Sequence, residues 1–279
     1  MRARHFSGFL GILGWPLNHT LSPAIQNAAL RKAGIDWVYL AWPTPPEVLS
    51  DAIVGLRALG CLGANITMPH KEAVIEHLDV VSGDARAVGA VNTIQRVGDR
   101  LIGHNTDVDG FREFMLADAG ADVAGKTALV LGSGGAARAV VKALDDLGTS
   151  AITIAARTPE RGENLISLAP RGNASVIGWS EAETRAGEFD VIVNTTPLGS
   201  EGADPIPEGR LHSGQLVVDL IYEPPTTKLV ERARAAGAEA WGGLGMLVHQ
   251  AAWSFRIWTG QHPSVETMSA AALHSVLRR

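Results

Sequence analysis

The sequence predicts an α/β protein of two domains, in which helices cover mainly parallel sheets. Its length of 279 residues corresponds to about two domains of roughly 150 residues each. Hydrophobic residues make up 46% of the chain and charged residues 19%, a composition that can bury a core. Segments typical of strands and of helices alternate along the chain, as they do in parallel sheets joined by crossover helices.

Charge and cysteine content exclude several classes of partner and of site. The formal net charge is −5 and no basic run is present, which argues against nucleic acid or an anionic membrane as the main partner. Cys61 is the one cysteine, so a disulfide framework and a thiolate-rich zinc site are excluded. No apolar run reaches the ~18 residues that span a bilayer. We therefore expect a cytoplasmic protein without a metal site. We also expect a monomer or a homodimer that acts on a small molecule.

The first expected element lies near the N-terminus. Arg2 and Arg4, followed by the apolar stretch 8–14, weakly resemble a secretory signal. Glycines dilute that stretch, Pro16 ends it, and no small-residue cleavage site follows. We therefore expect a buried strand over 8–14.

The next elements follow from helix-end signals and apolar periodicity. A helix over 23–33 starts at a proline and is followed by Gly34, the residue typical of helix C-termini. A strand is expected over 37–41. The spacing of apolar residues predicts a helix over about 46–59 with one apolar face, formed by Leu49, Ala52, Ile53 and Leu56.

Turn signals organise the following segment. A strand near 61–66 is followed by a helix that begins at Pro69. Gly98-Asp99 is typical of a two-residue hairpin turn, so residues 91–104 are expected to form two antiparallel strands. This hairpin makes the first sheet mixed, although mainly parallel.

The second half repeats the alternation after a helix over about 108–118 that leads to Gly120. Buried strands are expected over 127–131, 151–155, 190–194 and 216–220. Helices are expected over 136–147 and, as the final element, over about 244–259.

A glycine-rich turn indicates nucleotide binding. Residues 132–137 read G-S-G-G-A-A, which fits G-x-G-x-x-A directly after an expected strand and at the start of a helix. Gly132 permits the tight turn, Gly134 lets the backbone approach a pyrophosphate, and Ala137 lets the helix pack on the sheet. The first N–H groups of the helix then face the phosphates. The alternative is a glycine-rich turn that binds nothing.

The end of the next strand favours NADP over NAD. NAD sites usually carry an acidic residue there, which binds the ribose 2′-hydroxyl. This chain has Arg157, Thr158 and Arg161 instead, without a carboxylate at the strand end. Guanidinium groups and a hydroxyl suit a 2′-phosphate.

A second glycine motif is rejected. Residues 120–127 match the P-loop pattern G-x-x-x-x-G-K-T, but a working P-loop lies between a strand and the helix that follows it. Here the expected helix precedes the motif and the expected strand follows it.

Lys71 is the first candidate for catalysis. It shares the spacing i, i+3, i+4, i+7 with Val74, Ile75 and Leu78, so it is expected to point toward the packed side of a helix. A cation is also unfavourable at a helix N-terminus. Violated local rules are expected at functional sites, although a long lysine side chain can also reach water from such a position.

Other polar residues stand at expected element ends. Asp107 begins a helix, where a carboxylate is common as a cap, and it can alternatively hold a lysine ammonium. Thr20 and Ser22 stand at the start of the first long helix and can present two hydroxyls to an anion. Further polar residues follow strands, where ligands of α/β sheets bind: Asn65, Thr67 and Asn92.

Together these segments resemble the shikimate dehydrogenase family, over nearly the whole chain and in the family's order. The first-half motifs are N-H-T-L-S-P (18–23), N-I-T-M-P-H-K (65–71), G-A-V-N-T (89–93) and N-T-D (105–107). The second-half motifs are the glycine turn (132–138), R-T (157–158), N-T-T-P-L-G (194–199), D-L-I-Y (219–222) and G-L-G-M-L-V-H-Q (243–250).

The resemblance implies an NADP-dependent oxidoreductase that interconverts shikimate and 3-dehydroshikimate in aromatic amino-acid (chorismate) biosynthesis. It implies a substrate domain of residues 1–107 plus 246–279 and a Rossmann-type NADP-binding domain of residues 108–245. Lys71 would be the general acid–base, with Asp107 as its partner. The implied substrate-binding residues are Thr20, Ser22, Asn65, Thr67, Asn92, Asp107, Tyr222 and Gln250. The implied NADP-binding residues are Gly132, Ser133, Gly134, Gly135, Ala136, Arg157, Thr158, Arg161, Thr195, Leu220 and Gly243.

A lysine fits this chemistry. Alcohol oxidation needs a base for the hydroxyl proton while a hydride leaves, and the reverse reaction needs an acid. An ammonium also stabilises the developing alkoxide. Other routes lack their residues, because H-E-x-x-H is absent and neither tyrosine is followed by a lysine four positions later.

Two departures from the family pattern keep alternatives open. Thr20 stands where the family most often has serine, and Ala156 replaces the asparagine usual before Arg157. The alternative enzyme is a quinate/shikimate or amino-shikimate dehydrogenase that uses NAD or both cofactors. A more distant alternative is a catalytically silent NADP-binding regulator, although Lys71 and Asp107 are both present.

Overall fold

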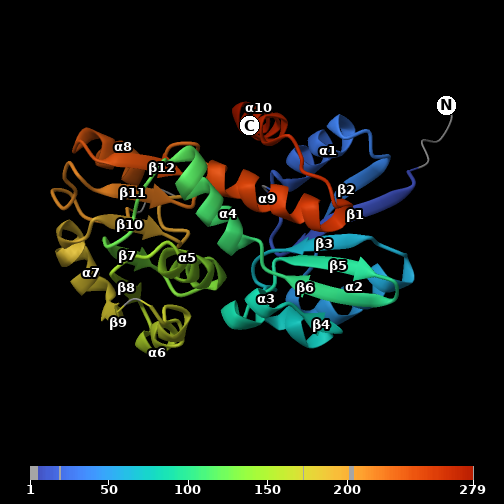
Figure 1. Cartoon of the computed structure of the whole chain (residues 1–279), viewed down its shortest axis with the longest axis horizontal. Helices are drawn as coiled ribbons and strands as arrows, with labels where there is room; N and C mark the ends of the chain where they lie inside the picture. The colour runs from blue at the N-terminus through green and yellow to red at the C-terminus, as the bar shows by residue number, and fades with distance from the viewer. Residues whose placement is uncertain (1–5, 19, 172, 201–203, 279) are drawn as a thin grey trace. The chain divides into compact units, whose positions relative to one another are not determined.

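The computed structural model describes residues 6–18, 20–171, 173–200 and 204–278. The chain divides into two compact units. The first unit is Met1–Thr106 together with Val248–Arg279, and the second unit is Asp107–Leu247. Each unit contains its own six-stranded sheet (Figure 1).

The first unit is built on a mixed sheet in the order β2-β1-β3-β5-β6-β4. Its strands are β1 (Gly8–Gly14), β2 (Trp37–Pro43), β3 (Gly63–Ile66), β4 (Val80–Val81), β5 (Thr93–Val97) and β6 (Arg100–His104). β1 lies parallel to β2 and β3, and β4 lies parallel to β6. The β5–β6 hairpin supplies the antiparallel pairings. The mixed, mainly parallel sheet predicted from the sequence is therefore confirmed.

Helices pack on this sheet through their apolar faces. They are α1 (Ser22–Lys32), α2 (Leu49–Ala58), α3 (Gly83–Val88), α10 (Val265–Leu277) and the part of α9 (Leu244–Thr259) that starts at Val248. The short 3-10 helices are η1 (Pro46–Val48) and η2 (Ala73–His77). Leu49, Ile53 and Leu56 of α2 are buried in one cluster with Ile66 of β3. The apolar face predicted for this helix is confirmed.

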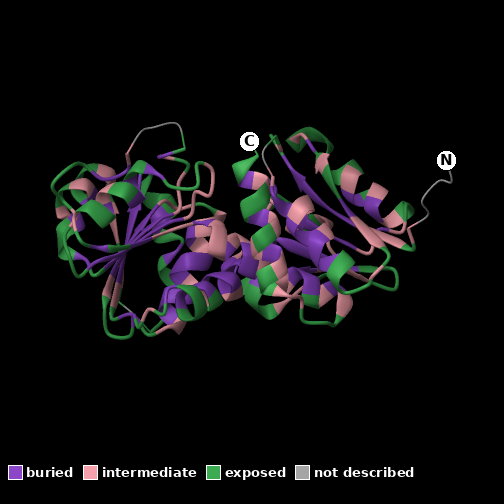
Figure 2. Ribbon diagram, turned by 90° about the horizontal axis from the view of Figure 1, so that it is seen from above, coloured by how far each residue is buried: buried purple, intermediate pink, exposed green. Residues whose placement is uncertain are grey.

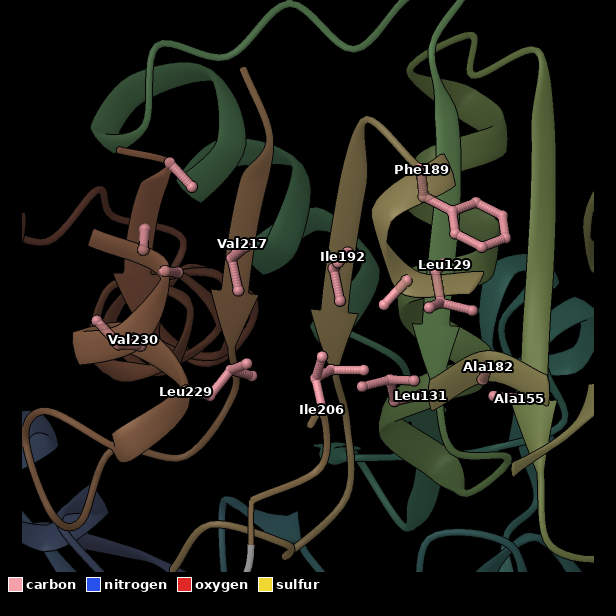
Figure 3. Packing of buried hydrophobic residues seen from close by; sticks show 14 residues of the cluster. Leu129, Leu131, Ala155, Ala182, Phe189, Ile192, Ile206, Val217, Leu229 and Val230 are labelled. Carbon is pink, nitrogen blue, oxygen red and sulfur yellow. The ribbon is translucent and has the colours of Figure 1, made fainter. Parts of the chain in front are cut away.

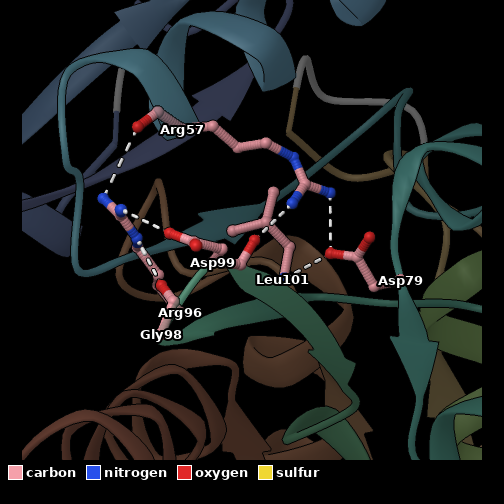
Figure 4. A network of polar contacts seen from close by, with 6 residues as sticks. All are labelled: Arg57, Asp79, Arg96, Gly98, Asp99 and Leu101. Carbon is pink, nitrogen blue, oxygen red and sulfur yellow. Dashed lines mark hydrogen bonds and ion pairs between the residues drawn. The ribbon is translucent and has the colours of Figure 1, made fainter.

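Charged side chains fasten the turn of the β5–β6 hairpin (Figure 4). Arg57 of α2 donates to the carbonyl oxygen of Asp99 at 2.7 Å and pairs with the Asp79 carboxylate at 2.7 Å. Asp79 also accepts a 2.7 Å hydrogen bond from the backbone N–H of Leu101, which lowers the pKa of its carboxyl. The turn residue Gly98 has a φ of +61°, as expected for a tight hairpin turn.

The second unit is built on a fully parallel sheet in the order β12-β11-β10-β7-β8-β9. Its strands are β7 (Thr127–Leu131), β8 (Ala151–Ala156), β9 (Asn173–Gly178), β10 (Val191–Asn194), β11 (Leu216–Asp219) and β12 (Glu239–Gly242). In chain order this is 3-2-1-4-5-6, the Rossmann arrangement. The direction of strand addition reverses between β7 and β10, which is where such sheets bind ligands.

Helices connect these parallel strands. They are α4 (Asp107–Glu113), which continues as a π-helix (Phe114–Asp118), then α5 (Gly135–Asp146), α6 (Pro159–Glu163), α7 (Trp179–Arg185) and α8 (Lys228–Ala235). Strand residues are largely buried, as the purple ribbons of Figure 2 show. Leu129, Ile192 and Val217 from neighbouring strands lie in one apolar cluster with Leu229 and Val230 of α8 (Figure 3).

Two sequence predictions about helices are wrong. The chain forms a turn at Lys71 instead of the helix predicted from Pro69, and only the 3-10 helix η2 follows. The reason is a tertiary contact, because the carbonyl oxygen of Lys71 accepts a 2.7 Å hydrogen bond from the N–H of Val91. The helix predicted as the final element, α9, is followed by α10.

A glycine in β3 allows α9 to approach the sheet. The indole N–H of Trp258 donates to the carbonyl oxygen of Ile94 at 2.8 Å. A Cβ on Gly63 would collide with the Trp258 indole and lie 2.5 Å from the same carbonyl oxygen. β3 therefore needs a residue without a side chain at this position.

We predict that Gly63→Ala lowers the free energy of unfolding by about 1–3 kcal/mol, the usual cost of overpacking. Gly55→Ala is the matched control, because a Cβ on Gly55 of α2 has no neighbour within 4 Å. Urea denaturation of both variants checks the prediction. Equal unfolding midpoints for the two variants would contradict it.

Candidate active site

The strand ends of the first unit carry two of the predicted substrate-binding residues. Leu13 of β1 pairs with Ile66 of β3, and both strands run in the same direction. The N–H of Thr67 donates to the carbonyl oxygen of Leu13 at 2.9 Å. Asn65 and Thr67 therefore lie at the carboxyl edge of the sheet, where α/β proteins bind ligands.

Thr20 and Ser22 meet at the start of α1. Ser22 is the first residue of the helix and is buried. Its backbone N–H lies 3.2 Å from Thr20 Oγ1 and donates to it. The first N–H groups of a helix lack carbonyl partners within it and favour an anion. Both predicted carboxylate-binding residues thus stand at a helix end suited to a negative charge.

Asn65 is buried, and partners surround its side-chain amide. Its Oδ1 accepts a 2.7 Å hydrogen bond from the hydroxyl of Tyr39. Its Nδ2 has three acceptors nearby: the carbonyl oxygen of Asn92 at 3.1 Å, Thr93 Oγ1 at 3.0 Å and Ser254 Oγ at 3.0 Å. An amide nitrogen carries only two hydrogens, so these acceptors compete for them. The orientation of the Asn65 amide is therefore fixed by the protein.

Asn92 is held by the residue that follows the hairpin. It stands directly before β5, whereas Thr106 stands just after β6. The backbone N–H of Thr106 donates to Asn92 Oδ1 at 2.8 Å, and Asn92 Nδ2 donates to Thr106 Oγ1 at 3.0 Å. Thr93 Oγ1 also donates to Asn92 Oδ1, at 3.0 Å. The hairpin thereby brings both its ends into one buried polar cluster.

Lys71 lies in the turn between β3 and η2 and is half-buried. Its carbonyl oxygen accepts the hydrogen bond from the N–H of Val91, and the preceding residue, His70, is also held in place. His70 is buried, and its Nε2 lies 2.7 Å from the carbonyl oxygen of Thr44, which follows β2. The segment that carries Lys71 is therefore hydrogen-bonded to the residue after β2 and to the segment before β5, which lie on opposite sides of β3 in the sheet.

Gln250 comes from α9, the helix that also reaches the polar cluster. Its side chain is half-buried. Its carbonyl oxygen accepts a 3.0 Å hydrogen bond from Ser254 Oγ, one turn further along the helix. Because Ser254 Oγ also contacts Asn65 Nδ2, the structure links Gln250 to the end of β3.

The remaining predicted substrate residues belong to the second unit. Asp107 is buried as the first residue of α4, and Tyr222 is half-buried after β11. Lys71 lies in the first unit, so its pairing with Asp107 stays a prediction.

In the second unit, the glycine turn lies between β7 and α5. Gly132 has a φ of +114°, and a Cβ there would lie 2.6 Å from Thr195 Oγ1. Thr195 in turn donates through its N–H to the carbonyl oxygen of Leu131 at 3.0 Å. Exposed Gly134 is the N-cap of α5 and makes no side-chain cap, so it leaves the first N–H groups of the helix open. The following residues of the predicted set lie in the turn and first turn of α5: Ser133, Gly135 and Ala136.

The predicted 2′-phosphate residues stand together after β8. Arg157 is the first residue beyond the strand, Thr158 is the N-cap of α6, and Arg161 lies within α6. All three are exposed. The two guanidinium groups at this strand end suit a phosphate, and Glu160 and Glu163 of α6 stand beside them.

Buried hydrogen bonds tie the ends of β10 and β11. Asp219 Oδ1 accepts from Asn194 Nδ2 at 2.9 Å and from the N–H of Ile221 at 3.2 Å, and Oδ2 accepts from Thr227 Oγ1 at 2.6 Å. Burial raises the pKa of the Asp219 carboxyl above its usual value, and these hydrogen bonds offset only part of that rise. This cluster fixes the residues that follow both strands.

Gly243 and Leu220 also meet at this edge. A Cβ on Gly243 would collide with the backbone of Leu220. The N–H of Gly243 donates to the carbonyl oxygen of Ile221 at 3.0 Å. The end of β12 can therefore lie against the end of β11 only with glycine at this position.

Sequence reasoning missed several supporting residues. Tyr39 gave no signal, because an aromatic residue in a strand is typical of a core. Ser254 gave a weak signal as a buried hydroxyl in a largely apolar helix. Asn194 and Asp219 stand in the motifs 194–199 and 219–222, but the sequence alone indicates no role for them.

Two other kinds of functional feature are absent from the described ranges. No group of three or more His, Cys, Asp or Glu side chains in the described part of the chain can hold a metal ion. None of the described helices is long and apolar enough to cross a membrane.

The fold and the strand-end residues define a class of protein: a two-domain α/β protein with one mixed sheet and one Rossmann-type sheet that carries a glycine turn at its switch point. Three family models match the chain. The shikimate dehydrogenase substrate binding domain matches residues 12–94, shikimate / quinate 5-dehydrogenase matches residues 115–201, and the shikimate 5′-dehydrogenase C-terminal domain matches residues 243–273.

Relatives are similar over nearly the full length. A shikimate dehydrogenase (NADP+) of Archaeoglobus fulgidus is 41% identical over 273 residues, which are 96% of this chain and 98% of the relative. Shikimate 5-dehydrogenase of Thermus thermophilus, solved in complex with NADP(H) and shikimate, is 38% identical with a TM-score of 0.87 and covers 96% of this chain and 99% of that chain. Quinate dehydrogenase of Corynebacterium glutamicum, solved with NAD, is 30% identical with a TM-score of 0.89 and covers 97% and 100%. The chain belongs to the shikimate dehydrogenase family.

Proposed function

We propose that this protein is an NADP-dependent shikimate dehydrogenase, which interconverts 3-dehydroshikimate and shikimate in aromatic amino-acid biosynthesis. The carrying observation is identity over nearly the whole length to a relative named for this reaction. The strand-end residues of both units support it. In this proposal the first unit binds the substrate and the second unit binds the dinucleotide.

The residues of the second unit fit NADP. Gly132 has no side chain where the turn is tightest, and the start of α5 is open to phosphate. Arg157 and Arg161 suit the 2′-phosphate, which NAD lacks. Bound NADP+ supplies the acceptor for the hydride that leaves the alcohol carbon.

Lys71 is the proposed general acid–base. As a base its Nζ takes the proton of the substrate hydroxyl, and in the reverse direction it returns that proton to the carbonyl oxygen. Its positive charge stabilises the alkoxide that develops between these states. Asp107 is the proposed partner that holds the ammonium. Proton transfer in both directions therefore depends on one lysine.

The substrate is a small acid with ring hydroxyls. Thr20 and Ser22, at the start of α1, are the proposed carboxylate ligands. The proposed hydroxyl ligands are Asn65, Thr67, Asn92, Asp107 and Gln250, with Tyr222 nearby. A substrate with a carboxylate at one end and hydroxyls at the other matches these two sets of proposed ligands.

The same proposal includes a cytoplasmic location and a monomeric or homodimeric state, with no nucleic-acid partner. The net charge of −5 and the single, buried and free Cys61 support a reducing compartment and a small-molecule partner.

The deciding experiment compares initial rates of cofactor reduction with shikimate and quinate, each with NADP+ and NAD+. We expect the shikimate–NADP+ pair to dominate. Dominant quinate or NAD+ activity would support the alternative enzyme, with Thr20 and Ala156 as the positions to test. Silence in all four assays, with NADP+ still bound, would support the regulator.

We predict that Lys71→Ala lowers kcat about 100-fold or more, because general acid–base catalysis contributes at least that much, while NADP+ binding persists. Steady-state rates and cofactor titration check this. Lys71→Arg keeps the charge but cannot act as a base at neutral pH. Recovery of turnover in Lys71→Arg would show that charge alone is needed.

We predict that Arg157→Ala raises KM for NADP+ by about tenfold to a hundredfold, the loss of a charged hydrogen bond, and leaves KM for NAD+ nearly unchanged. Arg210→Ala is the control, because it also removes an exposed arginine. Arg210 lies next to Gly187, which precedes β10, and thus at the sheet edge opposite the one that carries the proposed NADP-binding residues. An equal rise for both cofactors would remove Arg157 from 2′-phosphate recognition.

A further inference from the structure

Tyr39 is fixed in place from three directions. Its backbone N–H and carbonyl oxygen both bond the side chain of Asn27 of α1, at 2.9 and 2.8 Å. Its ring lies 6.0 Å from that of Trp258 of α9. Its side chain is 1% exposed. The phenol is therefore held rigidly between β2, α1 and α9.

The Tyr39 hydroxyl reaches two of the proposed substrate ligands. It donates to Asn65 Oδ1 at 2.7 Å and makes a hydrogen bond with the side chain of Ser22. Burial raises the pKa of Tyr39 well above its usual range, so the hydroxyl keeps its proton at neutral pH. One phenol thus connects a proposed carboxylate ligand with a proposed ring-hydroxyl ligand.

Ser254 makes the matching connection from α9. Its Oγ is fully buried. It lies 3.0 Å from Asn65 Nδ2, 2.8 Å from Thr93 Oγ1 and 3.1 Å from Thr106 Oγ1. It also contacts the carbonyl oxygen of Gln250. A serine hydroxyl donates one hydrogen bond and accepts two, so this oxygen is saturated by protein partners and has no capacity left for a ligand.

We propose that Tyr39 and Ser254 are positioning residues of the substrate site, whose hydroxyls fix Asn65 against Ser22 on one side and against the backbone of α9 at Gln250 on the other. Neither residue needs to touch the substrate. Their contacts set the separation between carboxylate recognition and hydroxyl recognition before binding, so that the substrate meets ligands already oriented. This inference rests on the proposed function.

The test is steady-state kinetics of Tyr39→Phe with shikimate. This variant keeps the ring and removes one hydroxyl. We expect KM for shikimate to rise about three- to tenfold, the effect of one buried hydrogen bond, with kcat and KM for NADP+ within about twofold. Ser254→Ala is expected to act in the same direction, and it carries the test if Tyr39→Phe does not fold.

The double variant distinguishes positioning from general loss of stability. Both hydroxyls act through Asn65, so the double variant is expected to raise KM by less than the product of the single effects. The control is Gln95→Leu, which removes the 2.8 Å hydrogen bond from Gln95 to the carbonyl oxygen of Ile257. It weakens a contact between the sheet and α9 without touching a proposed ligand, so its KM is expected to stay at the wild-type value.

The outcomes separate the two proposals. An active wild-type enzyme whose Tyr39→Phe and Ser254→Ala variants keep the wild-type KM overturns the positioning role alone. A KM rise in Gln95→Leu equal to theirs also overturns it. A wild-type protein without shikimate activity overturns the proposed function, and the positioning role with it.

Discussion

Parallel strand direction is the constraint on which both halves of this protein depend. Because parallel strands end at the same edge of a sheet, the residues that follow them come together without being close in sequence. In the first unit this edge gathers Asn65 and Thr67 beside the segment after β1. In the second unit it gathers the turn at Gly132 beside Thr195. The antiparallel hairpin adds Asn92 to the first set.

The two edges carry side chains suited to ligands of different kinds. In the first unit, buried amides and hydroxyls satisfy one another, and an unsatisfied partner in such a place would cost about 1–3 kcal/mol. That penalty keeps the cluster in one arrangement, which suits a small rigid ring. In the second unit, backbone N–H groups and exposed arginines dominate. These groups suit a long, flexible, highly charged dinucleotide, whose phosphates need charge more than exact placement.

Sequence patterns predicted what depends on neighbouring residues. The turn at Gly98 and the glycine turn after β7 are local, and both predictions are confirmed. Helix α1 begins one residue before the predicted Pro23. The prediction of a helix from Pro69 was wrong because apolar periodicity does not show that the N–H of Val91 bonds the carbonyl oxygen of Lys71. β9 was missed because its residues are mostly half-buried or exposed. The partners of Asn65 could not be predicted, since Ser254 lies 189 positions away in the chain.

The turn of the β5–β6 hairpin sets the strand register, and this register determines which residues meet at the far end of the hairpin. Thr93 pairs with His104, and this register places Asn92 against Thr106. A shift of one residue would turn every side chain to the other face. Arg57 and Asp79 clamp the turn, so the spacing cannot adjust by slipping. Surface turns usually gain or lose residues easily during evolution. In this turn, such a change would displace Asn92 from Thr106 in the buried polar cluster.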